Sequence, residues 1–133
     1  MIKLQVKYLS FFFAVISLLS FFNIIYSYYL NYYLNLNTYY YCLIASILLS
    51  VLFFKFKSSE KKFSIFDKIL TVFFGYLLIP VILSIPFYFS IYNLTFLNSY
   101  FEAISGFTST GFTIFDNIKH IDQSIILWRS STQ

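Results

Sequence analysis

The fold class is decided by residues 8–54, which read YLSFFFAVISLLSFFNIIYSYYLNYYLNLNTYYYCLIASILLSVLFF. These 47 residues lie between two lysines and contain no charged side chain. About 20 helical residues cross a hydrocarbon layer roughly 30 Å thick, so the stretch is too long for one crossing and predicts two. Asn31, Asn35 and Asn37 cluster near its middle, where amide side chains favour a turn. We expect an N-terminal hairpin over residues 1–62, with spans at about 8–30 and 36–54.

A second uncharged run covers residues 69–101, which is 33 residues. It is too long for a single straight helix across the bilayer, and we expect a third span at about 69–92. Pro80 and Pro86 fall inside this span. Each removes a backbone donor, which neighbouring helices can accommodate in a membrane. The sequence allows either a tilted helix or a helix whose proline kinks serve as a gate.

The composition excludes several classes of protein. With 59% hydrophobic and 11% charged residues, the chain has too little polar surface for a soluble globule. The single Cys42 excludes an internal disulfide or a cysteine-built metal site, and the lone His120 has no partner for catalysis. No acid/base pair, nucleophile triad or phosphate loop is present, so we expect no enzyme. The pI of about 9.1 rests on nine basic residues, most of them beside apolar runs, and we expect no nucleic-acid partner.

The lysines predict the orientation. Lys3 and Lys7 precede the first span, five lysines separate the second and third spans, and the loop over residues 31–38 has none. The positive-inside rule therefore places the N-terminus in the cytoplasm and residues 93–124 outside. The five lysines are Lys55, Lys57, Lys61, Lys62 and Lys68.

A short helix is predicted over residues 99–107. Ser99 and Glu102 have capping-box spacing, and Gly106 discourages continuation of the helix. Such a helix cannot span a bilayer, so we expect it to be re-entrant from the outside, followed by non-helical backbone at membrane depth. Backbone of that kind is tolerated only when it is buried in protein or lines a water-filled path. Because Gly111 can adopt conformations closed to other residues, successive carbonyl oxygens of this backbone could point the same way and replace the hydration shell of a cation.

The C-terminal half resembles the first pore repeat of the Trk/Ktr potassium-uptake family, most closely its Trk-type membrane subunit. The resemblance covers about residues 66–133. Two positions depart from the family: Ser109 stands where a third threonine is commonest, and Phe112 is bulkier than the frequent alanine and more like the Ktr branch. The resemblance rests on Phe101-Glu102-Ala103-Ile104-Ser105-Gly106-Phe107-Thr108-Ser109-Thr110-Gly111, on Asn117-Ile118, and on Trp128-Arg129-Ser130 with Gln133.

The resemblance implies an all-α membrane protein in which residues 63–133 form one incomplete helix/pore-loop/helix repeat. Glu102 and Gly106 would support the pore helix, with Glu102 also attracting cations. Arg129 would either pair with Glu102 or snorkel to the interface. The repeat would comprise an outer helix at about 69–92, a pore helix at about 99–107, a filter at 108–112 and an inner helix beginning at 125–133. The filter would be Thr108, Ser109, Thr110, Gly111 and Phe112, with K⁺ at Thr110 and Gly111.

The implied function is potassium uptake in the bacterial cytoplasmic (inner) membrane, with K⁺ as the transported ion and no other cofactor. The implied partners are the remaining pore repeats, a second copy of the subunit and a cytoplasmic nucleotide-binding regulatory subunit. Because only one threonine-glycine filter candidate is present, we expect an N-terminal fragment that supplies one repeat of four. The alternative is a small non-transporting membrane anchor or assembly subunit, in which residues 99–133 form a folded outer cap.

Overall fold

The computed structural model describes residues 6–55, 64–117 and 120–133. In these residues all regular structure is helical, and no strand is present. Three stretches, Tyr8–Tyr29, Leu36–Lys55 and Ile65–Tyr88, are long and apolar enough to cross a membrane. The predicted all-helical class is therefore confirmed for these residues, with three candidate membrane spans. The helices are α1 (Val6–Tyr29), α2 (Leu36–Lys55), α3 (Ile65–Leu83), α4 (Ile85–Tyr88), α5 (Phe96–Phe107) and α6 (Gln123–Ser131).

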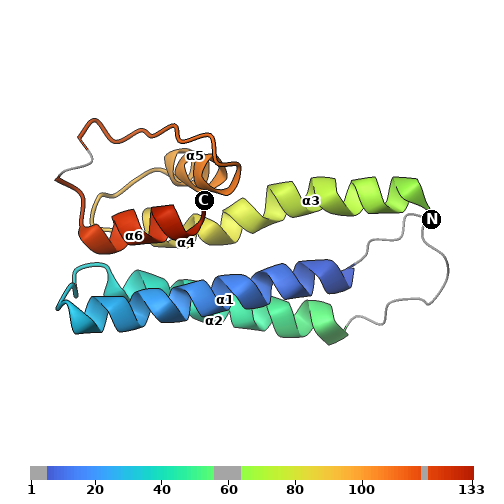
Figure 1. Cartoon of the computed structure of the whole chain (residues 1–133), viewed down its shortest axis with the longest axis horizontal. Coiled ribbons are helices and arrows are strands. Elements are labelled where there is room, and N and C mark those ends of the chain that lie inside the picture. Colours follow the sequence, from blue (N-terminus) through green and yellow to red (C-terminus); the bar gives the residue numbers. More distant parts are fainter. Residues whose placement is uncertain (1–5, 56–63, 118–119) are drawn as a thin grey trace.

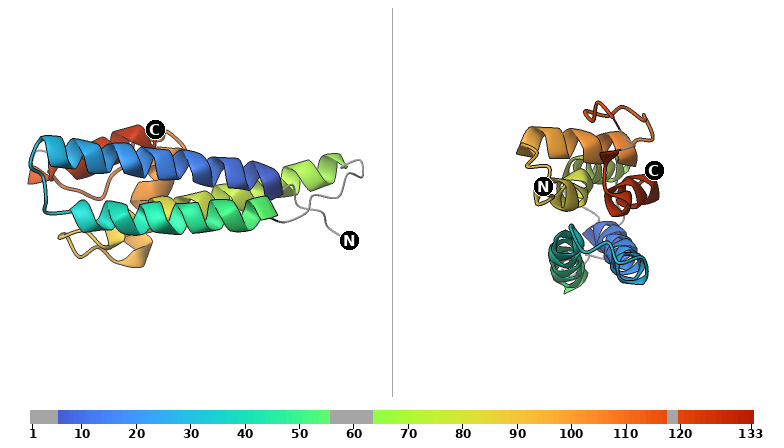
Figure 2. Two further views of the ribbon diagram at one scale, coloured as in Figure 1. Left: turned by 90° about the horizontal axis from the view of Figure 1, so that it is seen from below. Right: turned by 90° about the vertical axis from the view of Figure 1, so that its left-hand side faces the viewer.

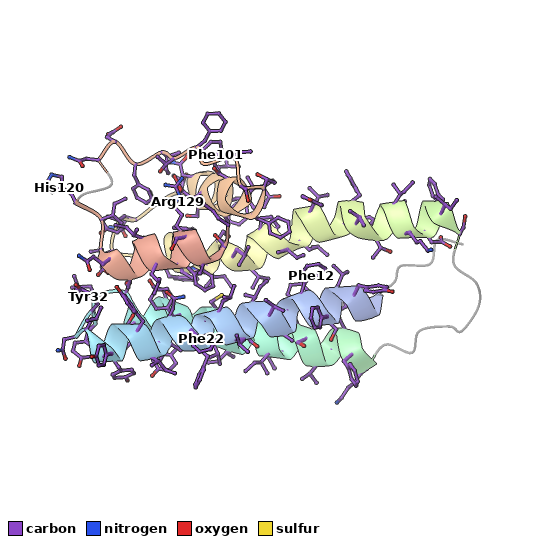
Figure 3. All side chains as sticks on the ribbon, in the orientation of Figure 1. Phe12, Phe22, Tyr32, Phe101, His120 and Arg129 are labelled. Atoms are coloured by element: carbon purple, nitrogen blue, oxygen red, sulfur yellow. The ribbon has the colours of Figure 1, made fainter. Side chains whose placement is uncertain are left out.

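The helices α1 and α2 form the predicted antiparallel hairpin (Figure 1). The turn between them includes Asn31 with φ of 61°, a left-handed conformation that asparagine adopts more readily than most residues. Further along the hairpin, Ser10 Oγ donates to the Ser50 carbonyl at 2.8 Å and Ser50 Oγ donates to the Ser10 carbonyl at 3.1 Å. The outward faces carry exposed aromatic side chains, including the labelled Phe22 (Figure 3). The bounds of α1 and α2 agree with the two predicted spans to within one or two residues.

The third span departs from the predicted bounds at both ends. It begins at Ile65, where the Asp67 carboxylate accepts a hydrogen bond from Ser64 N at 3.2 Å, and it breaks at Ser84 into α3 and α4. The stretch Ile65–Tyr88 as a whole is long and apolar enough to cross a membrane, so its bounds lie about four residues before the predicted 69–92 at each end, and the kink that the prolines allowed lies at Ser84. Pro86 explains the break, because it has no N–H for the Ile82 carbonyl. The Cys42 thiol donates to that oxygen instead, at 3.6 Å.

The C-terminal part packs on one side of the bundle, away from the outer face of the hairpin. Figure 2 shows α5 lying crosswise to the long helices, on top of α3, α4 and α6. After α5 the chain runs back along the bundle to the end where α1 and α2 are joined, and α6 starts there (Figure 1). The segment between α4 and α6 thus enters and leaves at one end of the molecule.

The core lies where α1, α2, α4 and α6 meet. Its largest member is Trp128 of α6, which is fully buried against the ring of Tyr39 at a centroid distance of 5.9 Å. The predicted division into residues 1–62 and 63–133 stays a prediction, since the two parts share this core. The buried apolar residues are Leu9, Phe13, Ile16, Ile24, Leu36, Tyr39, Cys42, Ile79, Leu83, Phe87, Ala103, Ile121, Ile125 and Trp128.

The two ends of the bundle differ in their side chains. Lys55 ends α2, and Lys68 lies in the first turns of α3, at one end. Exposed tyrosines surround the opposite end. Lys3, Lys57, Lys61 and Lys62 lie outside the described residues, so the cytoplasmic orientation of the N-terminus stays a prediction. The tyrosines are Tyr28, Tyr29, Tyr33, Tyr40, Tyr41 and Tyr88.

Candidate functional site

The helix α5 begins three residues before the predicted start. Its N-cap is Thr95, whose hydroxyl accepts from Asn98 N at 3.3 Å. Ser99 Oγ donates to the Thr95 carbonyl at 3.0 Å, so Ser99 lies inside the first turn. The predicted capping box of Ser99 and Glu102 is therefore wrong. A threonine hydroxyl one turn earlier satisfies the same need of the helix for an acceptor at its first amides.

Glu102 lies within α5, and its buried side chain bonds to the loop that follows this helix. Its side chain is fully buried, and Oε1 accepts from Thr113 Oγ1 at 2.7 Å and from Ile114 N at 2.6 Å. Hydrogen bonds to a carboxylate are stronger than those between neutral groups. Glu102 therefore fixes the far end of the loop to α5. It does not face solvent, which corrects the expectation that it attracts cations directly.

Arg129 of α6 lies on the other side of Glu102. The distance between Arg129 Nε and Glu102 Oε2 is 3.4 Å, and neither atom has a hydrogen-bond partner in the described residues. The Arg129 side chain is 13% exposed, and the Glu102 side chain is not exposed at all. Burial of a lone charge is costly, so each group compensates the other. The pair joins α5 to α6 and leaves no net charge behind the loop.

The same guanidinium binds the loop backbone. Arg129 Nη2 donates to the Gly111 carbonyl at 3.1 Å and to the Phe112 carbonyl at 2.8 Å. Ser105 Oγ of α5 also donates to the Phe112 carbonyl, at 2.6 Å. A carbonyl oxygen has two lone pairs, so the Phe112 oxygen is fully used, and the Gly111 oxygen has one lone pair left.

The carbonyl oxygens of Thr108, Ser109 and Thr110 are different. Among the described residues, none of these three oxygens accepts a hydrogen bond, although the amides of the same residues donate back to α5. All three residues are exposed. The loop therefore presents a row of unpaired acceptors at the C-terminal end of α5, where the helix dipole adds partial negative charge.

Two left-handed residues shape this row. Ser109 has φ of 55° and Gly111 has φ of 77°. The Gly111 conformation costs a glycine little and an L side chain about 1–2 kcal/mol. Thr110 lies between them, and its hydroxyl is 3.1 Å from Ser105 Oγ. The alternating backbone conformations turn the chain out of the helix and into the extended segment that follows.

Gly106 allows α6 to approach α5. A methyl group added at Gly106 would lie 2.5 Å from Thr132 Oγ1, too close for any real contact. Ser109 Oγ donates to the Gln133 carbonyl at 3.1 Å, just beside this crossing. Gly106 therefore serves close packing of the two helices.

The helix α6 is in turn anchored to the rest of the bundle. Asp122 caps it, with Oδ1 accepting from Ser124 N at 2.7 Å. Trp128 Nε1 donates to the Leu83 carbonyl at 3.1 Å, at the break after α3. Tyr39 Oη of α2 donates to Ser124 Oγ at 2.9 Å. The position of Arg129 therefore depends on contacts with α2 and α3.

The structure places four of the predicted site elements close together: Glu102, Gly106, Arg129 and residues 108–112. Arg129 pairs with Glu102 and donates to the carbonyl oxygens of Gly111 and Phe112, and Gly106 lies where α5 approaches Thr132 at the end of α6. Sequence reasoning quoted Ser105 only as part of the motif and gave no role to Ser105, Thr113 or Thr132, which bond to or pack against this group. Hydroxyl residues at these positions give no distinctive pattern. In the described residues, no group of three or more His, Cys, Asp or Glu side chains is placed to hold a metal ion.

Among known proteins, the chain is similar to an uncharacterized cation transporter of Methanocaldococcus jannaschii. The two are 29% identical over 103 residues, which is 76% of this chain and 22% of that transporter. The chain thus spans about a fifth of the length of the curated relative it matches. No family model matches the chain, and no solved structure matches it.

Proposed function

We propose that this chain supplies one pore-loop repeat of a potassium-uptake permease. In this proposal K⁺ loses its hydration water against main-chain oxygens of the loop after α5. The similarity to a cation transporter supports transport, and the three apolar helices support a location within the membrane. The choice of potassium rests on the resemblance of residues 101–111 to the Trk/Ktr filter region.

One observation carries the proposal. In the part of the chain that the structure describes, the carbonyl oxygens of residues 108–110 accept no hydrogen bond, while residues 111–114 are bonded to Arg129, Ser105 and Glu102. A loop built to bind cations needs free acceptors on one side and a rigid support on the other, because a preorganised site does not lose binding energy in ordering its own backbone.

The hydrogen bonds also indicate which carbonyl oxygens are free to coordinate an ion. Both lone pairs of the Phe112 oxygen are used within the chain, so we assign ion coordination to Thr108, Ser109, Thr110 and the remaining lone pair of Gly111. The Phe112 side chain is 68% exposed. Its ring is free to contact a neighbouring repeat.

The complete permease would require further repeats, and a homodimer with a cytoplasmic nucleotide-binding regulatory subunit is part of the proposal. The N-terminus would lie in the cytoplasm of a bacterial cell and the loop would face outward. This orientation agrees with Lys55 and Lys68 at one end of the bundle and with α5 and its loop nearer the other end (Figure 1).

The test is rubidium uptake by cells that make the full-length gene product with Gly111→Ala. We expect uptake to fall on the order of tenfold or more, because a side chain at φ of 77° costs about 1–2 kcal/mol and reorients the adjacent oxygens. Asn93→Ala is the matched control, since Asn93 also has positive φ, 48°, and lies outside the loop.

Equal uptake by the two variants would contradict the role of the loop. No uptake by the unaltered protein, although it reaches the membrane, would instead favour the anchor or assembly subunit.

A further inference from the structure

A cavity of about 380 Å³ lies between α1 and α3, and none of the loop residues 108–112 lines it. Its walls are almost entirely apolar. Leu9 and Phe12 line it from α1, Val72 and Ile79 from α3, and Phe107 from α5. Figure 3 shows Phe12 on the side of α1 that faces α3. A cavity of this size with apolar walls suits a hydrocarbon chain better than a polar solute.

The cavity is a groove that begins at one end of the bundle. The helices α1 and α3 run in the same direction (Figure 1), so Tyr8 and Lys68 lie at the same end, and both line the cavity. From Lys68 to Ile79 the helix rises about 16 Å at 1.5 Å per residue. This length matches about one leaflet of a hydrocarbon core roughly 30 Å thick.

The groove exists because Gly75 has no side chain. A methyl group built there would meet only Leu9 Cδ2 at 3.5 Å and Ile79 Cδ1 at 3.9 Å, which are ordinary contacts. A larger side chain would extend into the groove. The rings of Tyr76 and Phe107 also line the groove and contact each other, with centroids 5.3 Å apart at an interplanar angle of 63°.

The outer end carries a positive charge. Lys68 is exposed and has no ion-pair partner among residues 6–55, 64–117 and 120–133. The neighbouring Asp67 carboxylate bonds to Ser64 N at the start of α3. Tyr8 adds an exposed side chain at the same end. An ammonium group above an apolar groove complements a molecule with a negative head and a hydrocarbon tail.

We propose that this groove binds one acyl chain of an anionic phospholipid, with the lipid phosphate at Lys68. The chain would follow α3 past Gly75 and end against Phe107, the last residue of α5. The proposal does not depend on the proposed transport function, because it uses only the groove, its length and its charge.

Native mass spectrometry of the detergent-solubilised chain tests the proposal. The chain is titrated separately with phosphatidylglycerol and with phosphatidylcholine of the same acyl composition. We expect one bound phosphatidylglycerol, favoured over phosphatidylcholine. Lys68→Gln should lower this preference about fivefold, since a lysine near anionic headgroups contributes about 1 kcal/mol. Lys55→Gln is the matched control, because Lys55 lies at the same end but does not line the groove.

Two further variants test the groove itself. Gly75→Leu should reduce binding of both lipids, because it fills the groove, and leucine is a better helix former than glycine. Val72→Phe narrows the groove from a side chain that is 59% exposed, so it leaves core packing intact if Gly75→Leu fails to fold. Equal lipid preference in Lys68→Gln and Lys55→Gln, or undiminished lipid binding in a folded groove-filling variant, would overturn the proposal.

Discussion

The hairpin of α1 and α2 and the segment from α5 to α6 are held together in different ways. The hairpin is joined by apolar side chains along its length and by hydroxyl groups such as those of Ser10 and Ser50. The segment from α5 to α6 has a buried ion pair, and single side chains bond to chosen backbone oxygens. Apolar packing along a helix tolerates exchange of one apolar residue for another. The loop after α5 depends on individual atoms, and the function proposed for it uses those same backbone oxygens.

The largest effect is expected from breaking the ion pair. Arg129→Gln should destabilise the chain by about 3–5 kcal/mol, because it leaves the Glu102 carboxylate buried without its partner. The measurement is the free energy of unfolding in detergent micelles. The double variant Glu102→Gln with Arg129→Gln is the control, and it should lose less than the sum of the two single variants. Additive losses would show that the two groups do not interact.

Backbone conformation comes next. Gly111→Ala should cost about 1–2 kcal/mol of unfolding free energy, because φ is 77° and no atom within 4 Å of the new methyl group adds a clash. Ser109→Gly should instead be neutral or stabilising, since Ser109 already has φ of 55°. A thermal unfolding series on these two variants separates backbone strain from side-chain contacts. If Gly111→Ala and Ser109→Gly both lowered the unfolding temperature, backbone strain at these two positions would be ruled out as the cause.

The helix crossing gives a smaller net effect. Gly106→Ala should destabilise by about 1 kcal/mol, because the clash with Thr132 Oγ1 at 2.5 Å is partly offset by the better helix propensity of alanine. The variant Thr132→Ala removes the clashing atom, so adding it should restore stability. Failure of that rescue, measured by the same unfolding titration, would place the strain elsewhere.

The hairpin should respond least. Ser10→Ala removes the hydrogen bond from Ser10 Oγ to the Ser50 carbonyl and keeps the one from Ser50 Oγ to the carbonyl of residue 10. Such interhelical bonds contribute on average about 0.6 kcal/mol in a membrane. The Leu52→Ala variant, at an exposed position of α2, is a control that should have almost no effect. If Ser10→Ala cost as much as Arg129→Gln, the two regions would not differ as described.

The sequence predicts the spans well, because length and hydropathy alone decide them. The turn near Asn31 and the start of α2 follow from where the amides interrupt a long apolar run. The break at Ser84 could not be predicted in the same way. Two prolines fall within the third span, and the sequence does not show which of them interrupts it: Pro80 lies inside α3, whereas the break at Ser84 comes just before Pro86.

The candidate site is harder to predict from the sequence than the spans are. The residues predicted for the site stay a prediction, and the sequence does not give their geometry. Ser99 and Glu102 match a capping box, yet Thr95 caps the helix and Glu102 turns to the other side. Arg129 is far along the chain from the loop it binds, and its contact with the Phe112 oxygen follows from tertiary packing. Local patterns contain no information on contacts of this kind.

The exposed tyrosines around one end of the bundle affect how deeply the protein would sit in a bilayer. A phenol ring with an apolar body and a polar tip prefers the headgroup level of a bilayer to either hydrocarbon or bulk water. Rings such as Tyr29, which is 83% exposed, and Tyr33, which is 53% exposed, would resist vertical sliding of the bundle in either direction. With its vertical position fixed, the protein would keep the unpaired oxygens after α5 at a constant distance below the water surface.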